Sequence, residues 1–188
     1  MSLSVLCELL LCASCLWAAT ASVGRRYYWM ALGFLLIGAA ALLGAFNYAG
    51  FEQVKPWHQS VSGVSGKLAL VLIAAGGALS GWRRHLLVLL FAVVMLLLPG
   101  QLVLVGNLLA LLLIAWNGRS RGGLAVAGGV LFIVAGLLVG TQGAWQGIAR
   151  VDLFHLTLAL AVVCWALVLR PQRAVPAARA SDAAGAEG

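Results

Sequence analysis

Charged residues are scarce in this sequence. Of its 188 residues, 9% are Asp, Glu, Lys or Arg, and only 5 are acidic. Soluble domains usually carry about 25% charged residues, because their surfaces must be hydrated. The small charged fraction therefore excludes an ordinary water-soluble domain and indicates a chain surrounded by lipid.

Cysteine and histidine are also few, with 4 and 3 residues respectively. All four cysteines, at positions 7, 12, 15 and 164, lie within apolar segments, and none of their spacings resembles a zinc knuckle. This pattern excludes a disulfide framework or a cysteine-based metal fold. We expect the cysteines to serve as small packing residues.

Long hydrophobic segments, in contrast, fill most of the chain, which is 63% hydrophobic. An apolar run of about 17–25 residues is long enough to cross a bilayer as a helix. Seven such runs are present: Leu3–Ser22, Tyr28–Gly50, Val61–Gly81, His85–Gly100, Gln101–Asn117, Gly122–Gln142 and Val151–Leu169. Only Pro99-Gly100, a helix stop followed by a turn residue, separates the fourth run from the fifth. A single helix across that break would be about 45 Å long, too long for a hydrocarbon core of about 30 Å.

The sequence therefore predicts an all-α membrane protein, a bundle of seven transmembrane helices formed by residues 1–170. Residues 171–188 are rich in Ala, Arg and Pro and show no periodic apolar face, so we expect a disordered tail there. A secretory signal would carry basic residues before its apolar stretch. The first run has none, and Arg25-Arg26 follow it, so we expect it to be retained as a helix.

Basic residues alternate between the predicted connections. Nine lie in the first, third and fifth connections and after the seventh run: Arg25, Arg26, Arg83, Arg84, Arg119, Arg121, Arg170, Arg173 and Arg179. The other connections hold only Lys55 and Arg150. By the positive-inside rule the N-terminus is outside and the C-terminus cytoplasmic. The composition favours a multi-pass protein of a bacterial inner membrane.

The expected partners are membrane lipids. Nucleic acid is not expected, because the basic residues stand in pairs between apolar runs. Two motifs, Gly77-x-x-x-Gly81 and Gly136-x-x-x-Gly140, place small residues on one helix face. We expect close packing within the bundle at these motifs, with a homo-oligomer seam as the alternative.

Polar residues inside spans are costly and therefore informative. Five of them fall within about 10 Å of the predicted outer surface at 1.5 Å per residue: Glu8, Asn47, Lys67, Asp152 and His155. This polar layer is the predicted ligand-binding site, and each member also has a structural explanation. Lys67 is the expected partner of Glu8, since a carboxylate at that depth needs a cation or a proton.

Asp152 and His155 are three residues apart and share a helix face. A carboxylate beside an imidazole prepares it as a base or a metal ligand, so Asp152, His155 and Glu8 are the catalytic candidates. His58, in the predicted loop above, joins His155 and Asp152 as a candidate metal ligand. His85 is excluded, because it lies at the opposite end of a span. No cofactor is required by these residues, although zinc is possible.

Seven spans with Asp-Leu-Phe-His (Asp152 to His155) opening the last one resemble the ceramidase-like membrane hydrolase superfamily, which includes alkaline ceramidases and the progestin and adiponectin receptors. The resemblance implies a zinc site formed by histidines of helices two and seven. The family's Ser-x-x-x-His on helix two falls on Ala45 and Ala49 here. On helix seven His155 matches one histidine, while Val151 and Ala159 occupy the possible partner positions.

Two functions follow from this resemblance. The first is a divergent, non-enzymatic relative that binds a lipid through the polar layer, and the apolar residues at the serine and histidine positions favour it. The second is a zinc-dependent membrane amidase or lipid hydrolase with a reduced metal site, for which Asp152 or Glu8 would supply a third ligand.

Overall fold

The computed structural model describes residues 2–78 and 82–170. Within them the chain is almost entirely helical, which confirms the all-α prediction. In chain order the α-helices are α1 (Leu3–Gly24), α2 (Tyr28–Tyr48), α3 (Lys55–Ala78), α4 (Trp82–Leu97), α5 (Gly100–Gly118), α6 (Leu124–Ile133) and α7 (Arg150–Val168). Each of the seven predicted runs overlaps one of them. The predicted tail, 171–188, lies outside the described residues.

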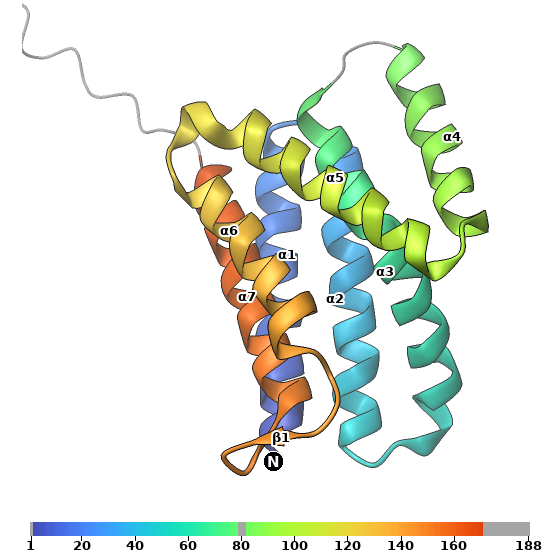
Figure 1. Cartoon of the computed structure of the whole chain (residues 1–188), viewed down its shortest axis with the longest axis vertical. Helices are drawn as coiled ribbons and strands as arrows, with labels where there is room; N and C mark the ends of the chain where they lie inside the picture. Colours follow the sequence, from blue (N-terminus) through green and yellow to red (C-terminus); the bar gives the residue numbers. More distant parts are fainter. Residues whose placement is uncertain (1, 79–81, 171–188) are drawn as a thin grey trace, which may run out of the picture.

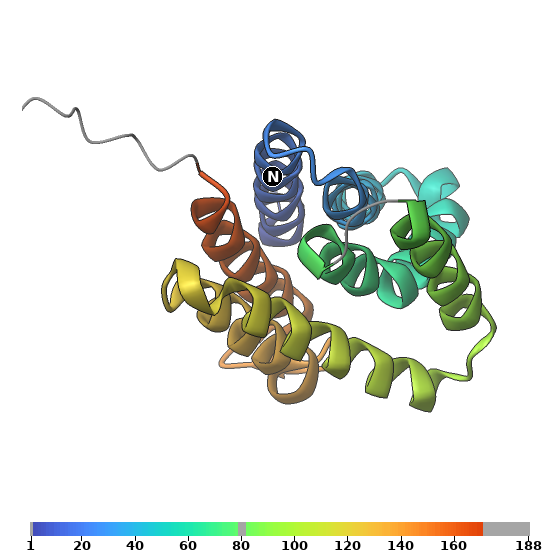
Figure 2. The same cartoon turned by 90° about the horizontal axis from the view of Figure 1, so that it is seen from above.

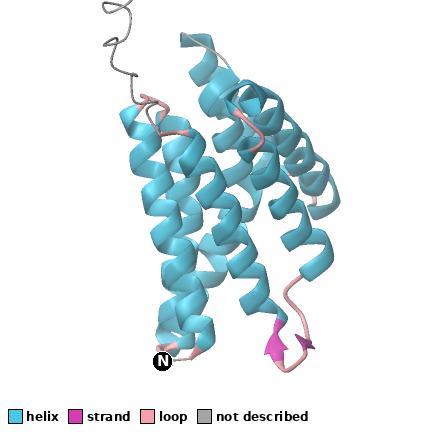
Figure 3. Ribbon diagram, turned by 90° about the vertical axis from the view of Figure 1, so that its left-hand side faces the viewer, coloured by secondary structure: helices cyan, strands magenta, loops and turns pink. Residues whose placement is uncertain are grey.

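Short elements join these helices. Two are 3-10 turns, η1 (Glu52–Val54) and η2 (Arg119–Arg121), and a π-helix, η3 (Val134–Val139), continues α6. Strands β1 (Ala144–Trp145) and β2 (Ile148–Ala149) pair antiparallel as a small hairpin before α7 (Figure 3). Both residues of its turn, Gln146 and Gly147, have positive φ, as two-residue hairpin turns of type I′ require.

Two helix boundaries, the α4–α5 break and the start of α3, can be compared with those predicted from the sequence. The break at Pro99-Gly100 is confirmed, since α4 ends at Leu97 and α5 begins at Gly100. The start of α3 was predicted at Val61 and is wrong, because the helix begins at Lys55. Pro56 stands in its first turn, where the missing backbone N–H removes no helical hydrogen bond. His58 is therefore part of a helix and not of a loop.

Six helices form a ring, seen from above in Figure 2. Around it α1 packs on α2, α2 on α3, α3 on α5, α5 on α6, α6 on α7, and α7 on α1. α4 lies outside the ring and packs on α3. α5 runs obliquely across the others, and its turn from α4 lies near mid-height of the bundle (Figure 1).

The helices alternate in direction, so like connections gather at the same end (Figure 1). We call the end of α1, the start of α2, the start of α4, the end of α5 and the end of α7 the arginine end. There Arg25 donates hydrogen bonds to the carbonyls of Leu169 and Arg170, at 2.7 and 2.6 Å. The opposite end, which we call the hairpin end, holds the start of α1, Lys55, the β1–β2 hairpin and Arg150.

Small side chains fill the helix contacts, and large apolar side chains face outward. Cys15, Ala18 and Ala161 are fully buried, whereas Leu90, Leu109 and Leu112 are more than half exposed. Five helices are long and apolar enough to cross a membrane, and α4 and α6 with η3 are shorter apolar helices. Close packing through small residues with leucine outside is the arrangement expected in a bilayer.

One of the two glycine motifs does not pack as predicted. A Cβ added at Gly136 or Gly140 would meet no atom within 4 Å, so close packing within the bundle is wrong for this motif. Gly81 of the other motif lies outside the described residues. The glycines that do permit close helix approach include Gly33, whose added Cβ would lie 2.6 Å from the Ala69 carbonyl oxygen, and Gly44, described below.

Candidate functional site: a polar cavity inside the ring

A cavity of about 270 Å³ lies inside the ring. Every ring helix contributes to its wall. Its polar lining residues are Glu8, His58, Ser62, Ser65, Asn107 and His155. Apolar side chains such as Leu11, Ile37 and Phe132 form the rest. The cavity thus combines a polar cluster with a largely apolar wall.

Glu8 provides the carboxylate of this cluster. It lies in the second turn of α1, on the face that also buries Leu11, Cys12 and Cys15. Its side chain is 1% exposed, and neither carboxylate oxygen has a hydrogen bond within the described part of the chain. Burying an unpaired ionised carboxylate is costly, so this side chain needs a proton or a positively charged partner.

His155 of α7 is the nearest polar group to Glu8, with 3.4 Å between His155 Nδ1 and Glu8 Oε1. The histidine is 14% exposed. Asp152 precedes it by one turn and is 4% exposed. Asp152 does not line the cavity, although it shares the first turns of α7 with His155 as predicted.

His58 reaches the same cluster from α3. Its Nδ1 lies 3.1 Å from the Ala40 carbonyl oxygen. A carbonyl can only accept, so Nδ1 carries the hydrogen and the neutral ring leaves Nε2 as an acceptor. A Cβ added at Gly44 would overlap Glu8 Oε1 and lie 3.1 Å from His58 Cε1. The carboxylate and this imidazole therefore converge over the bare backbone of Gly44.

Three polar lining residues were missed by sequence reasoning. Ser62 and Ser65 follow His58 at helical spacing on one face of α3, a polar stripe that the sequence does contain. Asn107 interrupts the apolar run of α5; its Nδ2 donates to the Gly66 carbonyl oxygen at 2.8 Å, and its Oδ1 has no partner within the described residues. A polar residue inside a span was the signal that could have identified it.

Two predicted members of the polar layer lie elsewhere. Lys67 Nζ donates to the carbonyl oxygens of Leu96 and Leu98, at 2.8 and 3.4 Å. The predicted Glu8–Lys67 pair is therefore wrong, because the end of α4 takes the ammonium group. Asn47 is half-buried near the end of α2 and does not line the cavity.

The structure brings together two of the three predicted metal ligands, His58 and His155, and adds Glu8 in place of Asp152. Among residues 2–78 and 82–170, no three His, Cys, Asp or Glu side chains are arranged so as to hold a metal ion. His85 lies at the arginine end, as predicted, and its Nδ1 accepts a hydrogen bond of 2.9 Å from Trp29 Nε1. That no cofactor is needed, with zinc as a possibility, stays a prediction.

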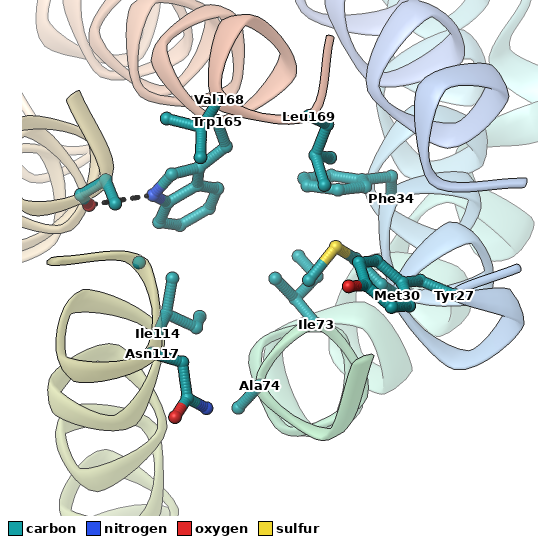
Figure 4. A pocket seen from close by; sticks show the side chains of 12 residues that line it. Tyr27, Met30, Phe34, Ile73, Ala74, Ile114, Asn117, Trp165, Val168 and Leu169 are labelled. Atoms are coloured by element: carbon teal, nitrogen blue, oxygen red, sulfur yellow. Dashed lines mark hydrogen bonds between the residues drawn. The ribbon is translucent and has the colours of Figure 1, made fainter. Parts of the chain in front are cut away.

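A second, smaller hollow of about 90 Å³ lies toward the arginine end (Figure 4). Trp165 lines it and donates through Nε1 to the Ala125 carbonyl oxygen at 3.1 Å, the dashed line in Figure 4. The Trp165 ring stacks on Phe132, with 5.7 Å between centroids. Because Phe132 also lines the larger cavity, this aromatic pair stands between the two hollows.

No family model matches the chain, and no curated protein or solved structure matches it either.

Proposed function

We propose that this protein is a multi-pass protein of a bacterial-type inner membrane, spanning it seven times with the hairpin end outside and the arginine end in the cytoplasm. The gathering of arginine at one end supports this orientation. Exposed tryptophans support the bilayer position, since such residues favour the two membrane interfaces. Trp57 and Trp145 lie at the hairpin end, and Trp82 and Trp116 at the arginine end.

The function proposed for the cavity is binding of a lipid-like amphiphile. The observation that carries it is a buried carboxylate without a hydrogen bond, Glu8, beside two histidines in a chamber whose remaining lining is mostly apolar. A ligand with a polar head and a hydrocarbon chain matches both kinds of wall. On this proposal the protein is a divergent member of the ceramidase-like bundles that lacks their full catalytic machinery.

The volume limits how such a ligand sits. Liquid water occupies about 30 Å³ per molecule, so about 270 Å³ admits a head group and the first carbons of a chain. The remainder must leave sideways between helices. Gly66 of α3 lines the cavity and is exposed, and Asn107 of α5 is bonded to it. We place the exit for the chain at this contact of α3 with α5.

Two glycines of α3 give a matched test. Gly63 and Gly66 are both exposed, and a Cβ on either meets nothing within 4 Å, but only Gly66 lines the cavity. The protein in lipid nanodiscs is irradiated with long-chain probes that carry a diazirine in the chain and a hydroxyl, carboxylate, ammonium or trimethylammonium head. Crosslinked peptides are quantified by mass spectrometry.

We expect at least one probe to label the cavity segments of α3 and α5, and Gly66→Leu to reduce that labelling several-fold. Gly63→Leu should leave it unchanged. Equal labelling of the two variants by all four probes would show that the cavity is not an amphiphile site.

A zinc-dependent membrane amidase or lipid hydrolase is the second candidate. His58, His155 and Glu8 come from three helices to line one cavity, and a catalytic zinc takes three protein ligands and a water. As described, the three side chains do not form a metal-holding group, so this candidate requires them to move together. In that case the metal would activate the water, with Asp152 as a further carboxylate near the site. The zinc measurement in the Discussion separates this candidate from the first.

A further inference from the structure

Most of the buried polar atoms of the cavity that have no hydrogen bond within the described residues are acceptors. Both Glu8 oxygens and Asn107 Oδ1 are acceptors without a hydrogen bond within the described residues, and His155 Nδ1 lies 3.4 Å from Glu8 Oε1. His58 presents Nε2 as a further acceptor, because its Nδ1 hydrogen is bound to the Ala40 carbonyl. One of the two side-chain N–H groups of Asn107 donates to the Gly66 carbonyl oxygen. The hydroxyls of Ser62 and Ser65 and the ring of His155 also line the cavity and can donate, but the buried groups without a hydrogen bond are mainly acceptors.

The formally charged side chain in the cavity lining is negative. Glu8 is the one acidic side chain lining the cavity, and no Lys or Arg is among the lining residues. Lys67 follows the lining residue Gly66 in the sequence, but its ammonium group donates to the Leu96 and Leu98 carbonyls at the end of α4. Phosphate and carboxylate head groups bring only acceptors and negative charge, so this lining opposes them.

We propose that the ligand of the cavity is an amphiphile whose head group is a primary or secondary ammonium, with its N–H groups donated to Glu8 and to neighbouring acceptors. This inference rests on the proposed function, since it names the chemical class bound at the same site. An ammonium supplies a positive charge, which no Lys or Arg of the lining provides, together with several donors for the buried acceptors. Charge-assisted hydrogen bonds of this type are about twice as strong as neutral ones.

Competition against the same probes tests this inference, because it ranks the affinities of the different head groups. Unlabelled amphiphiles of one chain length, with ammonium, trimethylammonium, hydroxyl or carboxylate heads, compete with whichever probe labels in a Gly66-dependent manner. We expect the primary ammonium to compete at concentrations about tenfold or more below the others, because a hydrogen bond to a charged group contributes that much to affinity.

Glu8→Gln is the decisive variant, because it keeps the side-chain shape and removes the charge. It should abolish the preference for the ammonium head. Glu52→Gln is the matched control, since Glu52 is exposed in η1 and outside the cavity; this variant should retain the preference. Size-exclusion profiles identical to the parent establish that both variants are folded.

The outcomes separate the two proposals. If hydroxyl, carboxylate or trimethylammonium heads compete as well as the primary ammonium, or if Glu8→Gln keeps the preference, the ligand class is wrong while amphiphile binding stands. If no probe labels in a Gly66-dependent manner, the proposed function itself fails.

Discussion

Substituting Gly44 by alanine tests the convergence of α1, α2 and α3 at the cavity. The added Cβ would overlap Glu8 Oε1 and lie 3.1 Å from His58 Cε1, so the carboxylate must leave its position. Overpacking of this kind costs about 1–3 kcal/mol, partly offset by the better helix propensity of alanine, about 1 kcal/mol. Gly63→Ala meets no atom within 4 Å and should show only the favourable propensity term.

We therefore expect Gly44→Ala to be less stable than Gly63→Ala by about 2 kcal/mol. Thermal unfolding in a mild detergent, followed by circular dichroism, measures the difference. In a Glu8→Ala background, where the carboxylate is gone, Gly44→Ala should cost less than in the parent, as a double-mutant cycle will show. Equal stability of the two glycine variants, or an unchanged cost in the Glu8→Ala background, would refute the packing of Glu8 on Gly44.

Three further predictions concern topology, the α4–α5 turn and metal. In a background with the four native cysteines replaced by alanine, Gln53→Cys and Ala144→Cys should react with a membrane-impermeant maleimide added to whole cells; protection of both sites would invert the proposed orientation. Lys67→Met removes the donor to the Leu96 and Leu98 carbonyls, so hydrogen exchange around residues 96–103 should quicken several-fold while Lys55→Met changes nothing there; equal exchange in both variants would contradict this anchoring role. Protein purified without chelator should contain substoichiometric zinc by elemental analysis, and stoichiometric zinc that disappears in His155→Ala would make the hydrolase the leading function.

The helices were predictable because bilayer thickness and hydrophobic length are directly related. Pro99-Gly100 was readable for an equally local reason, since proline ends a helix. The start of α3 was not found, because Trp57 to Ser60 are aromatic or polar and were read as a loop. Polar side chains do not prevent a helix from forming in this segment, because the helix is held by backbone hydrogen bonds. Its polar residues His58, Ser62 and Ser65 line the cavity.

Depth along the chain identified Glu8 and His155 but not their neighbours. Counting residues from the predicted ends of the helices placed Lys67 at the same depth as Glu8. Such counting cannot show how far one helix is shifted along the bundle axis relative to another. α4 ends beside Lys67 and provides carbonyls that no helix can satisfy internally at its own C-terminus. The position of the α4–α5 turn beside α3 therefore explains why Lys67 contacts the Leu96 carbonyl. It also explains why Asn107 contacts Gly66.

The α4–α5 turn lies near mid-height of the bundle. In a bilayer whose normal follows the ring axis, the cross-sectional area of the protein therefore differs between the two leaflets. Lys67, which contacts that turn, lies about 18 Å along α3 from its start at Lys55. The half of the protein toward the hairpin end therefore has no wall from α4 or from the start of α5. The leaflet at the arginine end has to make room for a wider cross-section than the opposite leaflet. Such a wedge displaces unequal areas of lipid from the two leaflets, and lateral pressure in the bilayer acts differently on its two halves.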